Sequence, residues 1–178
     1  MHISEVKTKV SVENRTETEK KILSQLEALK IPFELVDNDV VDTMEECKEI
    51  DEALGTEIRK SILLCNRKKT AFYLVVLPAE KRLDVKAFSK KVGLSGLSFA
   101  SQEYMEKFLK AKPGSASVMG LVNDVDDYVQ LVMDKEVAEE EWFGCNTGIN
   151  TSHLKIKTVD LLKKFLPKIR HHARVMEL

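Results

Sequence analysis

The stretch KSILLCNRKKTAFYLVVLP, residues 60–78, decides the fold class. Two apolar runs, Ser61–Cys65 and Ala71–Leu77, flank the polar segment Asn66–Thr70, and the second run ends at Pro78. Short apolar runs rich in branched and aromatic side chains are typical of strands, and a proline cannot donate to a strand ladder. The stretch therefore predicts a buried β-hairpin.

Helix signals lie on both sides of this hairpin. Thr16 and Glu19 have the spacing of a capping box, and the apolar residues that follow recur on one helical face until Pro32. Similar signals predict helices at 16–29, 43–55, 85–92, 102–109 and from 158 to Pro167, and strands at 33–36, 97–99, 129–133 and 154–157. Because strands and helices do not alternate strictly, the sequence predicts a single α+β domain on a mixed, twisted sheet.

Size and composition fit one globular domain. With 178 residues, 43% of them hydrophobic, the chain can bury one substantial core. No run approaches the roughly 18 apolar residues needed to cross a bilayer, and residues 1–16 are too polar for a signal peptide. We therefore expect no contact with a membrane and a cytoplasmic location. The three cysteines lack CxxC spacing, which predicts reduced thiols without a disulfide framework or a zinc knuckle.

The formal net charge of −1 limits the kind of nucleic-acid contact that can be expected. Proteins that wrap a duplex carry a large positive excess, so extensive duplex binding is not predicted. Local basic clusters occur at Arg67–Lys69, Lys81–Arg82, Lys90–Lys91 and Lys168–Arg174. They are either solvated surface or sufficient for a small footprint such as a tRNA acceptor end.

Two short motifs point to ligands but fail on spacing. Pro113–Gly120 is not followed by Gly-Lys-Ser/Thr and lacks GxGxxG spacing, so a nucleotide triphosphatase is not predicted. Asp124, Asp126 and Asp127 resemble the start of a calcium loop, but the loop glycine and the final glutamate are missing. A polar turn between strands is the better account, and we predict neither a metal site nor a cofactor.

No histidine or cysteine is singled out as a catalytic group. His171 and His172 are adjacent in a basic stretch and are expected to be exposed to solvent. His153 lies beside a predicted strand without a nearby partner, which favours a structural or surface role over a ligand or a base. A thiol nucleophile at Cys145 is disfavoured because no base is identifiable near it, although partners distant in sequence stay open.

A series of short segments matches one family in order and approximate spacing. The segments are Lys60–Leu64, Tyr73–Pro78, Lys81–Asp84, Leu97–Ser101, Pro113–Ser115, Gly120–Asp124, Asp134–Lys135 and Asn150–Thr151. Together they resemble the YbaK/ProX family, the relatives of the prolyl-tRNA synthetase editing domain. The resemblance implies a curved, barrel-like mixed sheet flanked by helices. It divides the chain into an extension at 1–15, an editing domain at 16–166 and a basic tail at 167–178.

The resemblance also implies a trans-editing deacylase that hydrolyses the ester of mischarged tRNA(Pro), with alanine as the first expected amino acid and cysteine or serine next. Its partner would be the acceptor end of the aminoacyl-tRNA. The sequence leaves the oligomeric state open between a monomer and a weak dimer. Lys60 would orient the substrate, and the backbone around Gly114 would contact the aminoacyl group and position water. The substrate-binding residues implied in the same way are Ser61, Ser115, Ser117, Val118, Met119, Gly120, Asn146, Asn150 and Thr151.

Three positions depart from the family pattern. Ser61 stands where an asparagine is common, Val118 where a proline closes the loop, and Asn146 where the alanine-specific branch has a histidine. Since an asparagine cannot titrate, a noncatalytic relative that binds aminoacyl-tRNA or a free amino acid as a sensor is the alternative. The position of Lys60 directly before an apolar strand has a second interpretation, in which its side chain only reaches from the strand end into water and does not bind a ligand.

Overall fold

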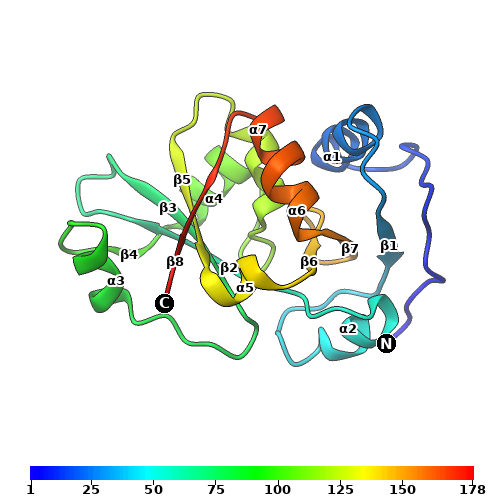
Figure 1. Cartoon of the computed structure of the whole chain (residues 1–178), viewed down its shortest axis with the longest axis horizontal. Coiled ribbons are helices and arrows are strands. Elements are labelled where there is room, and N and C mark those ends of the chain that lie inside the picture. Colours follow the sequence, from blue (N-terminus) through cyan, green and yellow to red (C-terminus); the bar gives the residue numbers. More distant parts are fainter.

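The computed structural model describes residues 1–178, in which eight strands alternate irregularly with short helices (Figure 1). The strands are β1 (Glu34–Asp37), β2 (Lys60–Cys65), β3 (Phe72–Leu77), β4 (Ser98–Phe99), β5 (Val129–Asp134), β6 (Trp142–Asn146), β7 (Ser152–Lys157) and β8 (Ala173–Met176). The helices are α1 (Glu17–Ala28), α2 (Lys48–Leu54), α3 (Val85–Lys91), α4 (Gln102–Leu109), the 3₁₀ helix η1 (Val118–Asn123), α5 (Lys135–Glu139), α6 (Thr158–Asp160), the π-helical turn η2 (Leu161–Phe165) and α7 (Leu166–Lys168). None of these helices combines the length and the apolar character that spanning a membrane would require.

The predicted hairpin is confirmed and forms the middle of the larger sheet. β2 and β3 pair antiparallel from Lys60 opposite Leu77 to Cys65 opposite Phe72. The sheet has the order β4-β2-β3-β5-β8, and β5 runs parallel to both β3 and β8. All six residues of β3 are buried, which explains why its sequence is a continuous apolar run and not an alternating one.

A second, three-stranded antiparallel sheet has the order β1-β7-β6. It meets the first sheet where Ile58 forms a parallel bridge with Gly144 and the Arg59 N–H donates to the Gly144 carbonyl at 2.9 Å. A Cβ at residue 144 would lie 2.9 Å from the Glu57 carbonyl oxygen, so this approach requires a glycine. The α+β class with mixed strand pairing is confirmed, and the strands form two joined sections that do not close into a barrel.

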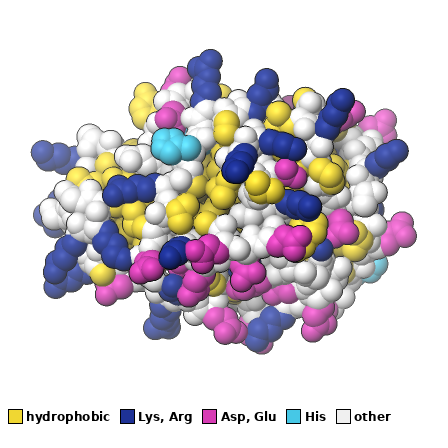
Figure 2. All heavy atoms as spheres, in the orientation of Figure 1, with side chains coloured by type: hydrophobic (Ala, Val, Ile, Leu, Met, Phe, Trp, Pro, Cys, Tyr) yellow, Lys and Arg dark blue, Asp and Glu magenta, His cyan; other side chains and the backbone are white.

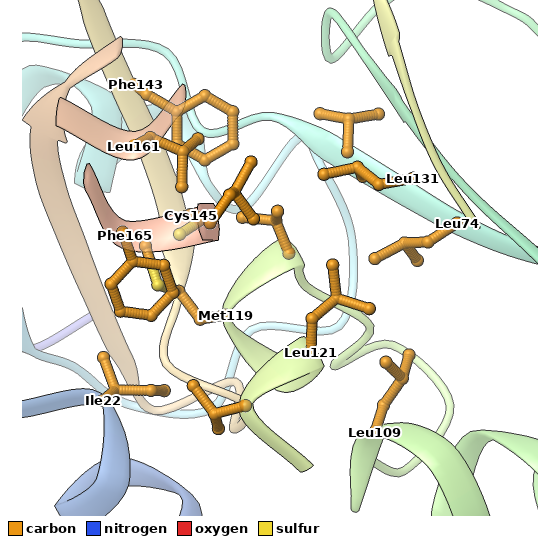
Figure 3. Close-up of a cluster of buried hydrophobic side chains, with 14 of the residues drawn as sticks. Ile22, Leu74, Leu109, Met119, Leu121, Leu131, Phe143, Cys145, Leu161 and Phe165 are labelled. Atoms are coloured by element: carbon orange, nitrogen blue, oxygen red, sulfur yellow. The ribbon is translucent and has the colours of Figure 1, made fainter. Parts of the chain in front are cut away.

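The main core lies between the two sheets and is closed by α1, α4, η1 and the C-terminal helical segment. Figure 3 shows Phe143 and Cys145 of β6 beside Leu161 and Phe165, with Met119 of η1 next to them. A second apolar cluster covers the other face of the hairpin and packs against α3. The hairpin is thus covered on both faces. Met119, which the resemblance implies as a substrate-binding residue, is part of the main core and has no exposed area.

Local capping signals determine some of the helix ends. Thr16 and Glu19 form the predicted capping box, in which each side chain accepts from the other residue's N–H. Gly55 ends α2 with a φ of +66°, as its position predicts. The predicted end of the last helix before Pro167 is wrong, because a wider π turn carries the chain past the proline to Lys168.

The C-terminal residues are part of the sheet. β8 pairs with the edge of β5, and its approach is held by His171, of which only 3% is exposed. The His171 Nε2 lies 3.0 Å from Asp124 Oδ2, and its Nδ1 lies 2.7 Å from the Ile169 carbonyl. The expected exposure of His171 is therefore wrong, since tertiary packing buries it against the turn before β5, whereas His172 is exposed. The division of the chain at residues 15 and 166 stays a prediction.

Candidate active site

A cavity of about 360 Å³ opens where the two sheets meet. Its walls come from the first half of β2, the loop before α2, the loop between α4 and η1, and the facing ends of β6 and β7. The lining residues are Val41–Met44, Cys47, Ile58–Leu63, Phe99, Ala100, Met105, Pro113, Gly114, Ala116, Asn146, Asn150 and His153. Half of them are apolar, so the site offers a hydrophobic surface with a few placed polar groups.

Lys60 is the first residue of β2 and lines the cavity. Its ammonium donates to the carbonyl of Lys81 in the loop after β3, so the side chain is held by protein and does not extend freely into water. Burial, followed by the charge of Arg82, lowers the pKa of Lys60 from its ordinary value. The cation is therefore partly desolvated, which strengthens its interaction with an anionic ligand.

The edge of β2 beside Lys60 leaves backbone groups facing the cavity. The Leu63 carbonyl accepts from the Ala100 N–H at 2.8 Å, on the side away from β3. Because backbone groups alternate in direction along an antiparallel strand, those of Ser61 face the same side as those of Leu63. β4 pairs only with the last two residues of β2, so no strand pairs with this edge at Ser61.

The loop between α4 and η1 supplies the other polar wall. Gly114 has a φ of +87°, a conformation that residues with a side chain rarely adopt, and the Ser115 N–H closes the turn onto Lys112. The N–H groups of Gly114 and Ala116 donate to no group in the protein. Both residues line the cavity, and free backbone donors are the kind of group that binds a carbonyl oxygen or an oxyanion.

Asn146 and Asn150, both predicted to bind substrate, line the cavity with side chains that already have partners. The Asn146 Oδ1 accepts from the Gly148 N–H at 2.8 Å, and its Nδ2 makes a long contact of 3.5 Å with the Ala116 carbonyl. The Asn150 Nδ2 donates to Asp42 Oδ1 at 3.0 Å. These amides therefore hold the β6–β7 turn against the neighbouring loops.

The remaining residues implied by the resemblance do not line the cavity. Ser117 is buried and donates to the Asn146 carbonyl at 2.9 Å, so it supports the loop from beneath. Val118, Met119 and Gly120 are buried in or beside η1, Ser115 is buried in the turn, and Thr151 is half-buried at the start of β7. Lys60, Ser61, Gly114, Asn146 and Asn150 are the predicted residues that the fold brings together at one cavity.

Several cavity residues were not predicted, of which His153 is chemically the most distinctive. Burial lowers the pKa of His153 to about 4. The register of β7 places it opposite Asn146 on β6, a pairing across a turn that no local motif marks. Asp42, Thr43 and Arg59 also line the cavity, and Arg59 is paired with Glu57 at 3.0 Å.

Two buried cysteines, Cys47 and Cys145, are poor candidates for a nucleophile at neutral pH. Burial raises the pKa of Cys47 to about 11 and that of Cys145 to about 12, so both thiols stay protonated. Cys145 faces the core, as Figure 3 shows, and does not line the cavity. The expectation against a thiol nucleophile at Cys145 agrees with this environment.

One group of possible metal ligands lies outside the cavity. Asp124, Asp127 and His171 place one ligand atom each within 4.8 Å of one another. The Asp124 carboxylate, however, already accepts from the N–H groups of Tyr128 and Val129 and from His171. These three side chains are therefore explained by a structural role, because their hydrogen bonds stabilise the turn that leads into β5.

Charge is divided unevenly over the surface. Figure 2 shows most of the Asp and Glu side chains in a band across the lower half of the displayed face, while Lys and Arg are spread over the whole of it. Lys81 is held by Asp134 at 2.8 Å, whereas Arg82 is exposed and makes no ion pair. The charge of Arg82 contributes to the lowered pKa of Lys60, although Arg82 itself does not line the cavity.

Comparison with known proteins is consistent with this arrangement. The family model described as "Aminoacyl-tRNA editing domain" matches residues 38–164. The prolyl-tRNA editing protein ProX of Acetoanaerobium sticklandii is 32% identical over 142 residues, which cover 80% of this chain and 87% of that protein. The prolyl-tRNA synthetase associated domain-containing protein 1 of Danio rerio is 24% identical over 148 residues, which cover 82% of this chain and 79% of that protein.

A solved structure shares the fold. The crystal structure of a candidate trans-editing enzyme for prolyl tRNA synthetase superimposes with a TM-score of 0.67 at 19% sequence identity. The match covers 92% of this chain and 97% of the other. The irregular two-part sheet is thus an established architecture.

Proposed function

The chain belongs to the aminoacyl-tRNA editing domain family, and from this premise we propose that it hydrolyses tRNA(Pro) charged with a small wrong amino acid, alanine first and cysteine or serine next. The enzyme class is aminoacyl-tRNA deacylase. The observation that carries the proposal is the cavity in which partly desolvated Lys60 shares the wall with the unpaired N–H groups of Gly114 and Ala116.

These groups match the charges of the reaction. Hydrolysis of an aminoacyl ester places negative charge on the carbonyl oxygen, and unpaired backbone donors stabilise such an oxyanion without reorganisation. In the proposed arrangement the Gly114 and Ala116 amides bind this oxygen, and Lys60 together with Arg82 binds the terminal phosphate. The nucleophile is water, since both thiols of the region stay protonated.

The size of the cavity supports a small aminoacyl group. About 360 Å³ lies near the lower end of the roughly 300–1,000 Å³ range of ligand pockets, so it suits an aminoacyl group with part of the terminal ribose. A synthetase pocket separates side chains that differ by one methylene by only about 1–3 kcal/mol. A second, smaller site that hydrolyses tRNA charged with the wrong amino acid corrects the errors that this small difference in binding free energy allows.

Deacylation of a panel of tRNA(Pro) samples charged with alanine, cysteine, serine or proline tests the proposal. We expect turnover of at least one small wrong amino acid and protection of Pro-tRNA(Pro). Turnover of none, together with measurable binding of aminoacyl-tRNA, would instead favour the noncatalytic sensor. One observation favours this second candidate. The amide of Asn146 is engaged in the β6–β7 turn and cannot titrate, so it offers no acid or base for catalysis.

Lys60→Ala tests the role of the lysine. Loss of a hydrogen bond to a charged group costs about 1.5–3 kcal/mol, so kcat/KM should fall by about 10- to 160-fold. Lys68→Ala is the matched control, because it removes the same charge from the exposed turn of the hairpin. Equal activity of Lys60→Ala and wild type on every mischarged tRNA would show that Lys60 has no such role.

A further inference from the structure

His153 is the only histidine that lines the cavity, and its ring is fixed between neighbouring strands. Its partners across the sheet are Val36 on β1 and Asn146 on β6, and only 2% of the residue is exposed. A side chain this enclosed is oriented by the fold and not by a bound ligand. The titratable side chains that share the cavity with it are those of Asp42, Cys47, Arg59 and Lys60.

Asn38 determines which nitrogen of the His153 ring carries the proton. The Asn38 Nδ2 donates to the carbonyls of Asp39 at 2.7 Å and Asn150 at 3.1 Å, which fixes the orientation of its amide. Its Oδ1 therefore faces the ring and lies 2.9 Å from the His153 Nδ1. Because a carbonyl oxygen only accepts, Nδ1 must donate, and Nε2 carries a lone pair.

The Nε2 atom is available to a ligand. It has no hydrogen-bond partner in the protein, and it is not among the polar atoms that are sealed from solvent without a partner. Since the residue lines the cavity, its small accessible area faces the ligand space. Burial lowers the pKa of His153 to about 4, so the ring stays a neutral acceptor at the pH of translation.

We propose that His153 is a catalytic residue whose Nε2 accepts a hydrogen bond from a hydroxyl at the reacting ester, either the attacking water or the free ribose hydroxyl beside it. This role rests on the deacylase function proposed above. In the reaction the water oxygen bonds to the ester carbonyl carbon, the bond from that carbon to the ribose oxygen breaks, and one water proton ends on the ribose oxygen. The other water proton leaves the new carboxylic acid. His153 orients the O–H group, and the developing oxyanion is bound by other groups of the cavity wall.

Variants of His153 with a matched control test the proposal. We expect His153→Ala to lower kcat by about 100-fold with little change in KM, in line with the loss of a positioned acceptor. His153→Gln, which keeps a side-chain acceptor, should recover part of that loss. His171→Gln is the control, because His171 is also a buried, hydrogen-bonded histidine but lies outside the cavity. It should lower the melting temperature and leave kcat unchanged.

A comparison of substrates identifies the hydroxyl that donates to His153, and a pH series tests whether the ring is neutral. On tRNA whose terminal ribose lacks the free hydroxyl, disappearance of the His153→Ala effect assigns the ribose hydroxyl, and persistence assigns the water. The ratio of wild-type to His153→Gln kcat should stay constant from about pH 7.5 to 5.5, because a ring with a pKa of about 4 does not titrate there. A ratio that falls about tenfold below pH 6.5 contradicts a neutral acceptor.

A readout on the wild-type protein covers the case in which the variants fail to fold. Imidazole ¹⁵N spectra should show Nδ1 protonated and Nε2 unprotonated in the free protein, with an Nε2 shift on addition of a non-hydrolysable amide analogue of alanyl-adenosine. Unchanged kcat in His153→Ala, or an Nε2 resonance that does not respond to the analogue, overturns the proposal. If wild type hydrolyses no mischarged tRNA, the deacylase function itself fails, which is a distinct result.

Discussion

Substitution of Gly114 by alanine separates the backbone of the cavity wall from its side chains. A Cβ at residue 114 would have no heavy atom within 4 Å, so the change introduces no collision. The φ of Gly114 is +87°, however, and a residue with a side chain is strained in that region. Gly114→Ala therefore acts only through the backbone conformation that presents the two unpaired amides.

The magnitudes follow from these two facts. Forcing an alanine into the left-handed region costs about 1–2 kcal/mol, and the stiffer unfolded chain returns about 0.4–1 kcal/mol. The net loss of stability should therefore lie between about 0 and 1.6 kcal/mol. If the loop relaxes its φ and turns one amide away, the loss of one oxyanion donor lowers kcat by about 100-fold.

The assay pairs urea unfolding with deacylation of the mischarged tRNA that wild type hydrolyses best. Gly96→Ala is the matched control, because Gly96 has a φ of +70°, has open space at its Cβ and lies outside the cavity. We expect similar stability losses in both variants and loss of kcat in Gly114→Ala alone. A Gly114→Ala variant with the control's stability and full kcat would refute the role of the loop amides.

Two further predictions concern stability. Gly144→Ala would place a Cβ 2.9 Å from the Glu57 carbonyl, a backbone group that cannot rotate away, so urea unfolding should show a loss of about 1–3 kcal/mol; wild-type stability would contradict the close junction. Burial opposes protonation of His171, but its hydrogen bonds to Asp124 and Ile169 raise its pKa. A histidine whose pKa is raised by folding contributes its full stabilisation at pH values below its pKa in the unfolded chain, about 6.5. It loses that stabilisation as the pH rises through its pKa in the folded protein. The stability margin of wild type over His171→Gln should therefore shrink from pH 6 to pH 8, and a margin that grows would reverse the assignment.

Much of the fold follows from rules that act within a few residues. The capping box at Thr16 and Glu19 and the apolar runs on either side of Asn66–Thr70 each specify an element through their own side chains. The β6 strand was not predicted, because Trp142–Asn146 contains a glycine and an asparagine that disfavour strands. It exists because its backbone pairs with β7 and because Gly144 permits contact with the chain before β2.

The same distinction separates the predicted and the missed parts of the site. Lys60 and Gly114 line the cavity, and the sequence predicts them as site residues because they stand in short segments whose order along the chain is characteristic. His153 was judged a structural or surface residue, because its neighbours in the cavity are distant in sequence. Only the pairing of β7 with both β1 and β6 brings its ring between Val36 and Asn146. A prediction of long-range strand register would have been needed to place it.

Asn146 connects the two walls of the cavity and so couples the two proposals. Its backbone carbonyl accepts from Ser117 beneath the Gly114 loop at 2.9 Å, while its strand position is opposite His153. The oxyanion donors and the histidine acceptor thus belong to separate structures that meet at this residue. Asn146→Ala removes the Oδ1 that accepts from Gly148 and the long 3.5 Å contact of Nδ2 with the Ala116 carbonyl, but leaves the contact with Ser117, because that contact uses the backbone. The shorter of the two lost contacts is the one within the β6–β7 turn, so the substitution should displace the His153 side of the site more than the Gly114 loop, which keeps its hydrogen bond from Ser117.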